Sequence, residues 1–487
     1  MKSSFSLYII LLILGLGAYL VLSFGSRLES DSAASARRDQ SPTGVISSLQ
    51  PEAPEKSQPR ISSVLLDNLR GPLSLLLLQV IVVLITARLL GGLFLKIGQP
   101  SVVGEMIAGI ILGPSLLGAA FPKALTFLFP MSSLEALRLL SQIGVILFMF
   151  IVGMEMNTRR LQEKARAALV ISNAGIVVPF FLGITASLFI YRRFAPPGIP
   201  FISFALFMGV AMSVTAFPVL ARVIEERGMY NTYVGSTAIA CAAADDVTAW
   251  CILATVIAIV KLNGMGLSVL TVFLAMTFTV FMLRVLKPVL KRLIVTDAEV
   301  QKNDNSIVAG ALSLAFISAC FTEVIGVHAL FGAFLAGAIM PTDGALRTLL
   351  REKLATFSTV ALLPLFFVIT GLRTQAMLLN DWQSWLVCVG IIGVAIAGKL
   401  GGCTLAARWA GMSWPDSISI GVLMNTRGLM ELVALNIGYD LGILSERIFA
   451  MMVLMAIVTT CMTGPLLSLI EFVLRINREQ PRLAASA

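Results

Sequence analysis

Long apolar segments, separated by short polar ones, dominate the chain from residue 72 onward. A segment of about 20 apolar residues is long enough to cross roughly 30 Å of hydrocarbon as a helix. Backbone N–H and C=O groups in lipid must be paired, and a helix pairs them internally. The pattern predicts an all-α polytopic membrane protein. Its core has thirteen expected spans, at 72–95, 101–120, 137–156, 167–191, 200–224, 233–261, 266–285, 306–323, 327–341, 356–373, 384–409, 416–437 and 447–473.

The N-terminal region has a different pattern. Residues 5–24 form one apolar run, whereas 26–64 are rich in Ser, Pro and Gln with mixed charge and no hydrophobic period. The long run without a clear small-x-small cleavage site favours an uncleaved anchor over a signal peptide, and the composition that follows is typical of a disordered linker. We therefore expect four parts: an N-terminal anchor or signal sequence (1–25), an extracytoplasmic linker (26–71), a transmembrane domain (72–473) and a short cytoplasmic tail (474–487).

Composition agrees with a membrane location. The chain is 57% hydrophobic and 13% charged, with a mean hydropathy of +0.91, while soluble domains are nearer a quarter charged. The net charge of +9 forms no basic stripe or tail, so we expect no nucleic-acid partner. Loops on one side carry 19 Lys and Arg against seven on the other. This bias predicts a multi-pass protein of the inner (plasma) membrane, with a cytoplasmic C-terminus and the linker outside.

An internal repeat is visible in two short matches. Residues 212–218 (MSVTAFP) align with 423–428 (LMNTRG), so that Thr215 corresponds to Thr426. The second match joins three residues of GEMIAGIILGP with three of GAFLAGAIMP, namely Gly104, Ala108 and Gly109 with Gly332, Ala336 and Gly337. The spans from 101 to 261 and from 327 to 473 number five each. An odd repeat unit placed end to end must be inverted, as in many ion-coupled transporters.

Two adjacent acids, Asp245 and Asp246, lie near the centre of the span at 233–261. A charge at the bilayer centre costs about 2.5–3.5 kcal/mol on insertion scales, so such residues mark functional sites. Neighbouring helical residues point about 100° apart, so one acid can face an ion path while the other faces a fixed partner. The partner candidates are Lys399 and Arg427, with Glu431 one turn beyond Arg427.

Breaks in two spans would add oxygen ligands. Pro218 removes a helical hydrogen bond within 200–224 and frees carbonyls near Thr215, while Asn425 and Gly428 weaken 416–437. Two discontinuous helices that cross would present their dipole ends near the acids; an ordinary proline kink is the alternative. Na⁺ and K⁺ are hard cations that prefer oxygen. A carboxylate that binds either a proton or such a cation, and not both, is sufficient for obligatory exchange.

Other polar residues in the spans are weaker candidates. Glu105 either faces the core bundle or has a structural pairing, and Arg427 and Glu431 either neutralise each other or belong to the ion path. The segment GVAIAGKL (393–400) lacks the Ser or Thr of a phosphate-binding loop and lies in an apolar span. One histidine, His328, and six cysteines without a C-x-x-C pair give no basis for a resident metal, a cofactor or an enzyme.

Five segments together resemble the monovalent cation:proton antiporter-2 family, across about 72–473. They are GQPSVVGEMIAGIILGPSLLG, SVTAFPVLARVIEERG, AAADDVTAW, HALFGAFLAGAIMP and MNTRGLMELVALNIG. The resemblance implies thirteen helices with inverted five-helix repeats, and a homodimer whose core moves against a dimerisation scaffold. It also implies that Asp246 carries the cation and the proton, that Asp245 pairs with Lys399, and that Thr215 belongs to an unwound crossing helix.

The resemblance leaves the transported cation open. Two aspartates with a lysine are similar to the sodium-type, charge-moving members, which implies two protons per cation. MNTRGLMELVALNIG is similar to the potassium-handling exchangers instead. We therefore expect a secondary active antiporter of Na⁺, with a K⁺/H⁺ antiporter as the main alternative. A sodium-coupled organic-anion symporter and a transport-dead sensor are further alternatives, which the intact Asp245, Asp246 and Lys399 disfavour.

Overall fold

The computed structural model describes residues 14, 17–23, 68, 71–155, 165–229, 232–261, 265–293, 304–341 and 345–484. Within these ranges every regular element is a helix. Among the described residues, ten helices are long and apolar enough to cross a membrane, and the bent pair α22 (Trp414–Met424) and α23 (Leu429–Asp440) adds an eleventh. The predicted all-α polytopic class is confirmed. Fewer than thirteen spans meet this length criterion, because the predicted spans at 200–224 and 327–341 contain only short apolar helices.

Helices of the first half cover the predicted spans closely. They are α4 (Pro72–Lys96), α5 (Ser101–Leu112), α6 (Pro122–Leu128), α7 (Met131–Glu155), α9 (Ala165–Phe194), α10 (Phe201–Ser213), α11 (Phe217–Glu226) and α12 (Tyr233–Lys261).

The second half continues in the same way. Its remaining α-helices are α13 (Met265–Phe281), α14 (Lys287–Leu293), α16 (Asp304–Val324), α17 (Ala329–Ala338), α18 (Ala345–Leu350), α19 (Leu363–Arg373), α20 (Trp382–Ile396), α21 (Gly402–Trp409) and α24 (Glu446–Ala484). Five π-helical turns join or extend these helices, at η1 (Pro114–Gly118), η2 (Met282–Leu286), η3 (Arg351–Ala355), η4 (Ser358–Leu362) and η6 (Ala397–Gly401), and η5 (Ala376–Leu378) is a 3₁₀ turn.

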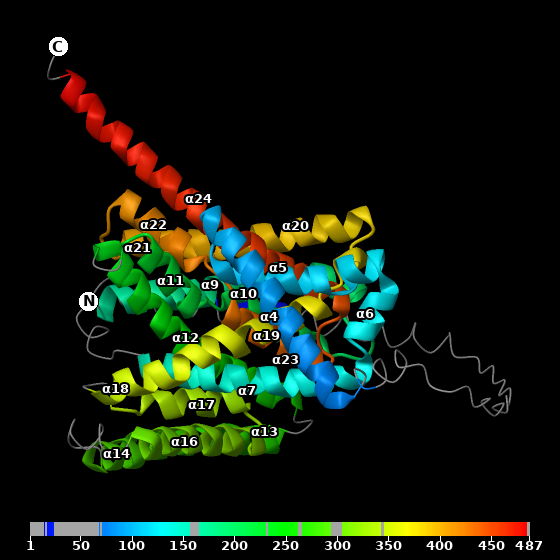
Figure 1. The fold of residues 1–487 in the computed structure, drawn as a ribbon. Helices are drawn as coiled ribbons and strands as arrows, with labels where there is room; N and C mark the ends of the chain where they lie inside the picture. The colour runs from blue at the N-terminus through cyan, green and yellow to red at the C-terminus, as the bar shows by residue number, and fades with distance from the viewer. Residues whose placement is uncertain are drawn as a thin grey trace, which may run out of the picture.

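Packing divides most of the helices into two groups. We call α4–α7 with α16–α19 the scaffold bundle, and α9–α12 with α20–α24 the core bundle. In Figure 1, α13, α14 and α16 lie along one edge of the molecule, and α20, α22 and α24 lie along the opposite edge. The interior is densest where α10 and α22 end: residues 207–217 and 419–435 are buried without exception.

The two matched glycine segments make matching contacts. A Cβ at Gly104 would lie 2.6 Å from a backbone oxygen of α4, and one at Gly332 would lie 2.1 Å from a backbone oxygen of α16. The second glycine of each segment faces another helix. A Cβ at Gly109 would lie 2.5 Å from a backbone oxygen of α19, and one at Gly337 would lie 1.9 Å from a backbone oxygen of α7. No side chain fits at any of the four positions. The sequence repeat therefore corresponds to a repeated packing arrangement, with α5 between α4 and α19 and α17 between α16 and α7.

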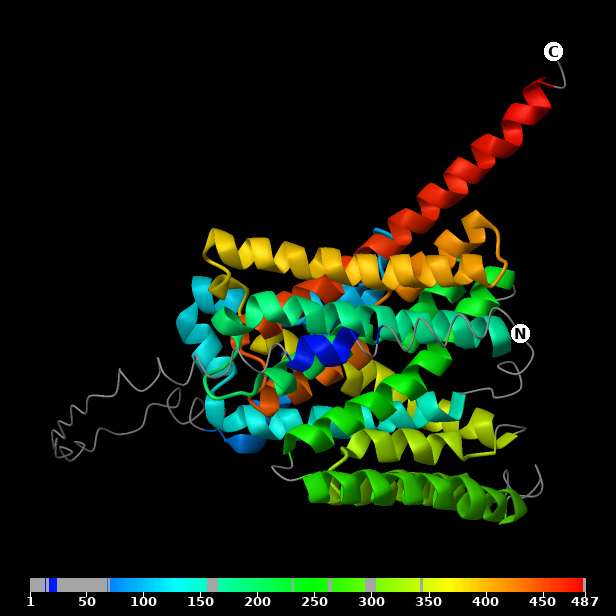
Figure 2. The ribbon, with the colours of Figure 1, turned by 180° about the vertical axis from the view of Figure 1, so that it is seen from behind.

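The predictions for the two ends of the chain have different outcomes. Most of the N-terminal run at 5–24, and the linker apart from residues 68 and 71, lie outside the described residues. Residues 17–23 are helical and lie against α9 (Figure 2), where a Cβ at Gly17 would be 2.9 Å from the Phe181 ring. At the other end, α24 continues through residues 474–484, which were expected to be a tail (Figure 1). Several residues there are good helix formers, such as Glu, Arg and Gln.

Candidate ion-binding site

The two predicted breaks meet inside the core bundle. Helix α10 ends at Ser213 and α11 begins after residues 214–216, while residues 425–428 separate α22 from α23. The backbone N–H of Ala216 donates to the carbonyl of Thr426 over 3.2 Å. The Thr215 hydroxyl lies 3.5 Å from the carbonyl of Met424. Two non-helical segments from the matched sequences are therefore in direct contact.

Local sequence accounts for where each helix stops. Val214 has an extended backbone, with φ −70° and ψ 138°. Pro218 is the second residue of α11, in the first turn, where backbone N–H groups have no intrahelical partner and a proline is tolerated. The span is thus two separate helices rather than one helix with a proline kink. In the other span, Asn425 follows the last residue of α22 and Gly428 precedes the first of α23, and both residue types have low helix propensity.

Asp245 is firmly held. Its Oδ2 atom lies 2.9 Å from the Lys399 ammonium and accepts a hydrogen bond of 2.7 Å from the Thr215 hydroxyl. All three side chains are fully buried. The structure thus brings together residues from α12, from the turn η6 and from the break after α10. One oxygen of this buried carboxylate thus has two strong donors, whereas Oδ1 has no hydrogen-bond partner among the described residues.

The Lys399 ammonium uses all three of its N–H donors. Besides Asp245, it donates to the backbone carbonyls of Gly175 and Ser213, both at 2.6 Å. A Cβ at Gly175, in α9, would lie only 2.7 Å from the Cys403 sulfur, although it would be in ordinary contact with Nζ at 3.6 Å. Sequence reasoning missed these two partners, because a backbone oxygen has no signature of its own in a sequence.

Asp246 has very different surroundings from its neighbour. Its side chain is 1% exposed, and neither carboxylate oxygen has a hydrogen-bond partner within the described part of the chain. The backbone N–H of Phe217, at the start of α11, lies beside it. The N-terminus of a helix carries partial positive charge, which favours an anion. Asp246 therefore combines burial, unused acceptor atoms and a position at the break between α10 and α11.

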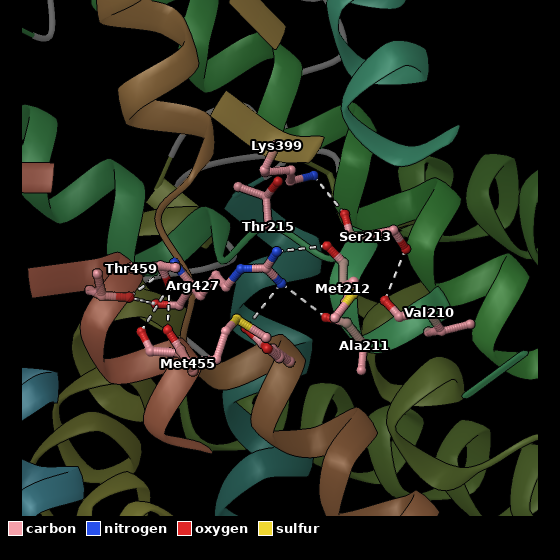
Figure 3. A network of polar contacts seen from close by, with 12 residues as sticks. Val210, Ala211, Met212, Ser213, Thr215, Lys399, Arg427, Met455 and Thr459 are labelled. Atoms are coloured by element: carbon pink, nitrogen blue, oxygen red, sulfur yellow. Dashed lines mark hydrogen bonds and ion pairs between the residues drawn. The ribbon is translucent and has the colours of Figure 1, made fainter. Parts of the chain in front are cut away.

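Arg427 and Glu431 are also fully buried where the breaks at 214–216 and 425–428 meet, which we call the crossing. Arg427 Nη1 lies 3.4 Å from Glu431 Oε2, and the guanidinium donates to the carbonyls of Ala211 at 3.0 Å and Met212 at 2.7 Å. Figure 3 shows the Arg427 side chain reaching from the break after α22 toward the end of α10. The carbonyls of the last three residues of α10 are therefore taken by the cationic side chains of Arg427 and Lys399. Those of Val214 and Thr215, which were expected to be freed, are not among the acceptors of these two side chains.

The remaining predicted residues fall in two places. Asn425 Nδ2 lies 3.7 Å from the sulfur of Met462, and the hydroxyls of Thr426 and Thr463 are 3.3 Å apart, so the second break is fastened to α24. Glu105 lies instead in α5 of the scaffold bundle, where a Cβ at Gly91 of α4 would be 3.8 Å from it. The structure therefore groups all the predicted site residues at the crossing except Glu105.

A buried crossing of two broken helices, with carboxylates beside it, is typical of ion-coupled membrane transporters. The chain belongs to the sodium/hydrogen exchanger transmembrane family, whose sequence pattern matches residues 81–472. This confirms the resemblance to cation/proton antiporters. The members of this family are transporters, so the chain is a multi-pass membrane transporter and not an enzyme.

Individual relatives extend over most of the chain. It is 42% identical over 395 residues to the Na⁺/H⁺ antiporter NhaS4 of Synechocystis, covering 81% of this chain and 96% of that protein. It is 35% identical to the K⁺/H⁺ antiporter 1 of Saccharomyces cerevisiae, covering 83% of this chain but 47% of that protein. Its fold is similar to that of the sodium proton antiporter MjNhaP1 from Methanocaldococcus jannaschii, with a TM-score of 0.59, 15% identity, and coverage of 80% and 93% of the two chains.

Proposed function

We propose that the chain is a secondary active antiporter that exchanges a monovalent cation, preferably Na⁺, for protons by alternating access. The observation that carries this proposal is the contrast between the two adjacent acids. Oδ2 of Asp245 accepts from Lys399 and Thr215, whereas neither oxygen of Asp246 has a hydrogen-bond partner among the described residues. A carboxylate in that state requires a positive partner, and the transported ion supplies one.

Competition at Asp246 then produces the exchange. A proton and an alkali cation each neutralise the carboxylate, and a carboxylic acid no longer attracts a second cation. Na⁺ and K⁺ bind oxygen ligands, and Asp246 offers two carboxylate oxygens beside the free oxygen Oδ1 of Asp245. An entering cation also competes with Lys399 for Asp245. Release of a proton when a cation binds is therefore the expected coupling step, and both acids take part in it.

Replacement of Asp246 tests the proposal directly. Purified protein in proteoliposomes with a pH-sensitive dye should show cation-driven proton efflux, and Asp246→Asn should reduce it to the background of empty vesicles, a loss of about a hundredfold or more. Asp440→Asn, at the far end of α23, is the matched control and should retain exchange. Substantial activity in a folded Asp246→Asn protein would show that the cation is carried elsewhere.

The same vesicles identify the ion and the charge moved. Pulses of Na⁺, K⁺ and Li⁺ given in turn, with the membrane potential recorded, distinguish the Na⁺/H⁺ exchanger from the K⁺/H⁺ alternative. The names of the relatives include both ions. With two acids and a lysine at the crossing, we propose two protons per cation. A Na⁺ response therefore comes with a potential change, whereas a one-for-one exchanger would leave the potential unchanged.

We further propose that the protein is a homodimer of the inner (plasma) membrane, with its C-terminus in the cytoplasm. The excess of Lys and Arg in alternate loops, 19 against seven, supports this orientation. Single cysteines placed beyond residue 473 and in the 374–381 loop should be labelled from opposite sides of intact cells. Cross-linking in native membranes reports the dimer.

A further inference from the structure

Helix α10 ends inside the molecule, yet the carbonyls of its last turn all have partners. An α-helix leaves its last four carbonyls without an intrahelical donor. At residues 210–213, the carbonyl of Val210 accepts from the Val214 backbone N–H and from the Ser213 hydroxyl, and the last carbonyl, that of Ser213, accepts from Lys399. The two between them, of Ala211 and Met212, both accept from the Arg427 guanidinium. Two cations therefore cover the negative end of this helix dipole.

Arg427 is fixed from the opposite side as well. Its backbone N–H donates to the Thr460 hydroxyl of α24 at 3.0 Å, and that hydroxyl donates to the Arg427 carbonyl at 2.7 Å. The main chain of Arg427 is thus held by α24 while its side chain holds α10 (Figure 3). Because Thr215 follows α10 directly and donates to Asp245, any displacement of the end of α10 also displaces a ligand of the acid pair.

Glu431 balances the charge of Arg427 but holds no other group in place by a hydrogen bond within the described residues. It lies one turn after Arg427, 3.4 Å from the guanidinium, and neither of its oxygens makes a hydrogen bond within the described residues. It lies in the first turn of α23, where a negative charge suits the helix dipole. Without Glu431, Arg427 would leave an uncompensated positive charge in the same buried crossing as Asp246.

We propose that these two residues have separate tasks in the exchange proposed above, on which this inference rests. Arg427 is a positioning residue that holds the end of α10, and through it Thr215, in the geometry that the acid pair needs. Glu431 keeps the net charge of the crossing low enough to admit the transported cation. The first task affects turnover, and the second affects the cation concentration needed for half-maximal exchange.

Charge-neutral substitutions separate the two tasks. In proteoliposomes, Glu431→Gln should raise the KM for the cation about tenfold, with kcat within about twofold of wild type, because the unpaired guanidinium repels the incoming ion through a poorly screened interior. In Arg427→Gln/Glu431→Gln the net charge is restored. Its KM should therefore return to within about twofold of wild type, while kcat falls about tenfold, since two carbonyls of α10 lose their donors.

A conservative variant protects the test against a folding defect. Arg427→Lys keeps the charge but replaces the forked guanidinium with a single ammonium, so its KM should stay near wild type with kcat between those of wild type and the double variant. Melting curves in detergent select folded preparations. An unchanged KM in Glu431→Gln, or a KM raised equally in the single and double variants, would overturn the charge-balancing role. A wild-type kcat in the double variant would overturn the positioning role.

Failure of the underlying function gives a different result. Asp246→Asn is measured in parallel, and if it exchanges cations like wild type, the carrier assignment is wrong. The pattern of KM and kcat in the Arg427 and Glu431 variants would still decide the roles of those two residues. The two failures are therefore distinguishable within one set of vesicles.

Discussion

Helix α23 carries charge at both of its ends, in opposite surroundings. Glu431, in its first turn, pairs with Arg427, and both side chains are completely buried. Asp440, its last residue, lies 2.6 Å from Arg138 of α7 and 3.0 Å from Arg373 of α19, with 27% of its side chain exposed. Each end pairs a carboxylate with arginine. The buried pair lies within the core bundle, whereas the exposed cluster joins the core bundle to the scaffold bundle.

The difference bears on what each group of charges contributes. Exposed ion pairs contribute about 0–1 kcal/mol and are screened by salt. Buried pairs lose about as much on leaving water as they gain from attraction, so stability alone does not explain their presence. The proposed ion exchange gives the buried acids and cations a role that stability does not, whereas the Asp440 cluster joins the two bundles.

Breaking the Asp245–Lys399 pair should have the largest effect on stability. Asp245→Asn or Lys399→Met alone should lower the free energy of unfolding by about 3–5 kcal/mol, because each leaves a buried charge without its partner. The double variant should lose much less than the sum of the two single losses. Denaturation in detergent measures all four proteins. Additive losses would mean that the two residues are not coupled and that the crossing resembles the exposed cluster.

Gly175→Ala tests the packing beside this pair, and its expected loss of stability is intermediate. The new Cβ would lie 2.7 Å from the Cys403 sulfur, and overpacking of a core costs about 1–3 kcal/mol. Cys403→Ala in the same protein should recover most of the loss by removing the sulfur. Gly393→Ala is the control, since a Cβ there meets no heavy atom within 4 Å. Equal melting temperatures for the two glycine variants would show that α9 adjusts freely.

Asp440→Asn should have the smallest effect. We expect a loss of about 1 kcal/mol or less in the free energy of unfolding at low ionic strength. The loss should shrink further in high salt, because both arginines are partly exposed and screened. Melting curves at two salt concentrations provide the measurement. A loss of several kcal/mol, insensitive to salt, would remove the distinction between the two ends of α23.

The sequence was most informative where one residue type contradicted its surroundings. Asp245, Asp246, Lys399, Arg427 and Glu431 are conspicuous because the spans around them are apolar, and all five lie buried in the core bundle. The breaks were predictable too, since Pro218 and Gly428 interrupt apolar runs. The sequence did not show where the freed carbonyls find donors, because that depends on the packing of α9, α10 and α24 and on backbone atoms of any residue type.

Local backbone geometry was equally beyond the sequence. Lys399 lies in a π-helical turn, for which its apolar, glycine-rich surroundings give no distinct signal. Glu105 was a reasonable candidate because it is an acid in an apolar span, yet only the packing of α5 against α4 shows that it belongs to the scaffold bundle. Adjacency on one helix predicted that the two aspartates differ, and the contacts of Lys399 and Thr215 show how.

The three acceptors of the Lys399 ammonium come from three helices, α9, α10 and α12. Two of them are neutral backbone carbonyls, of Gly175 and Ser213. If a cation draws Asp245 away, the lysine loses one contact and keeps two, so the ammonium stays anchored to α9 and α10. Lys399 therefore acts as a fixed positive charge. It repels an arriving cation unless Asp246 as well as Asp245 is free to attract that cation, which favours transport steps in which both acids take part.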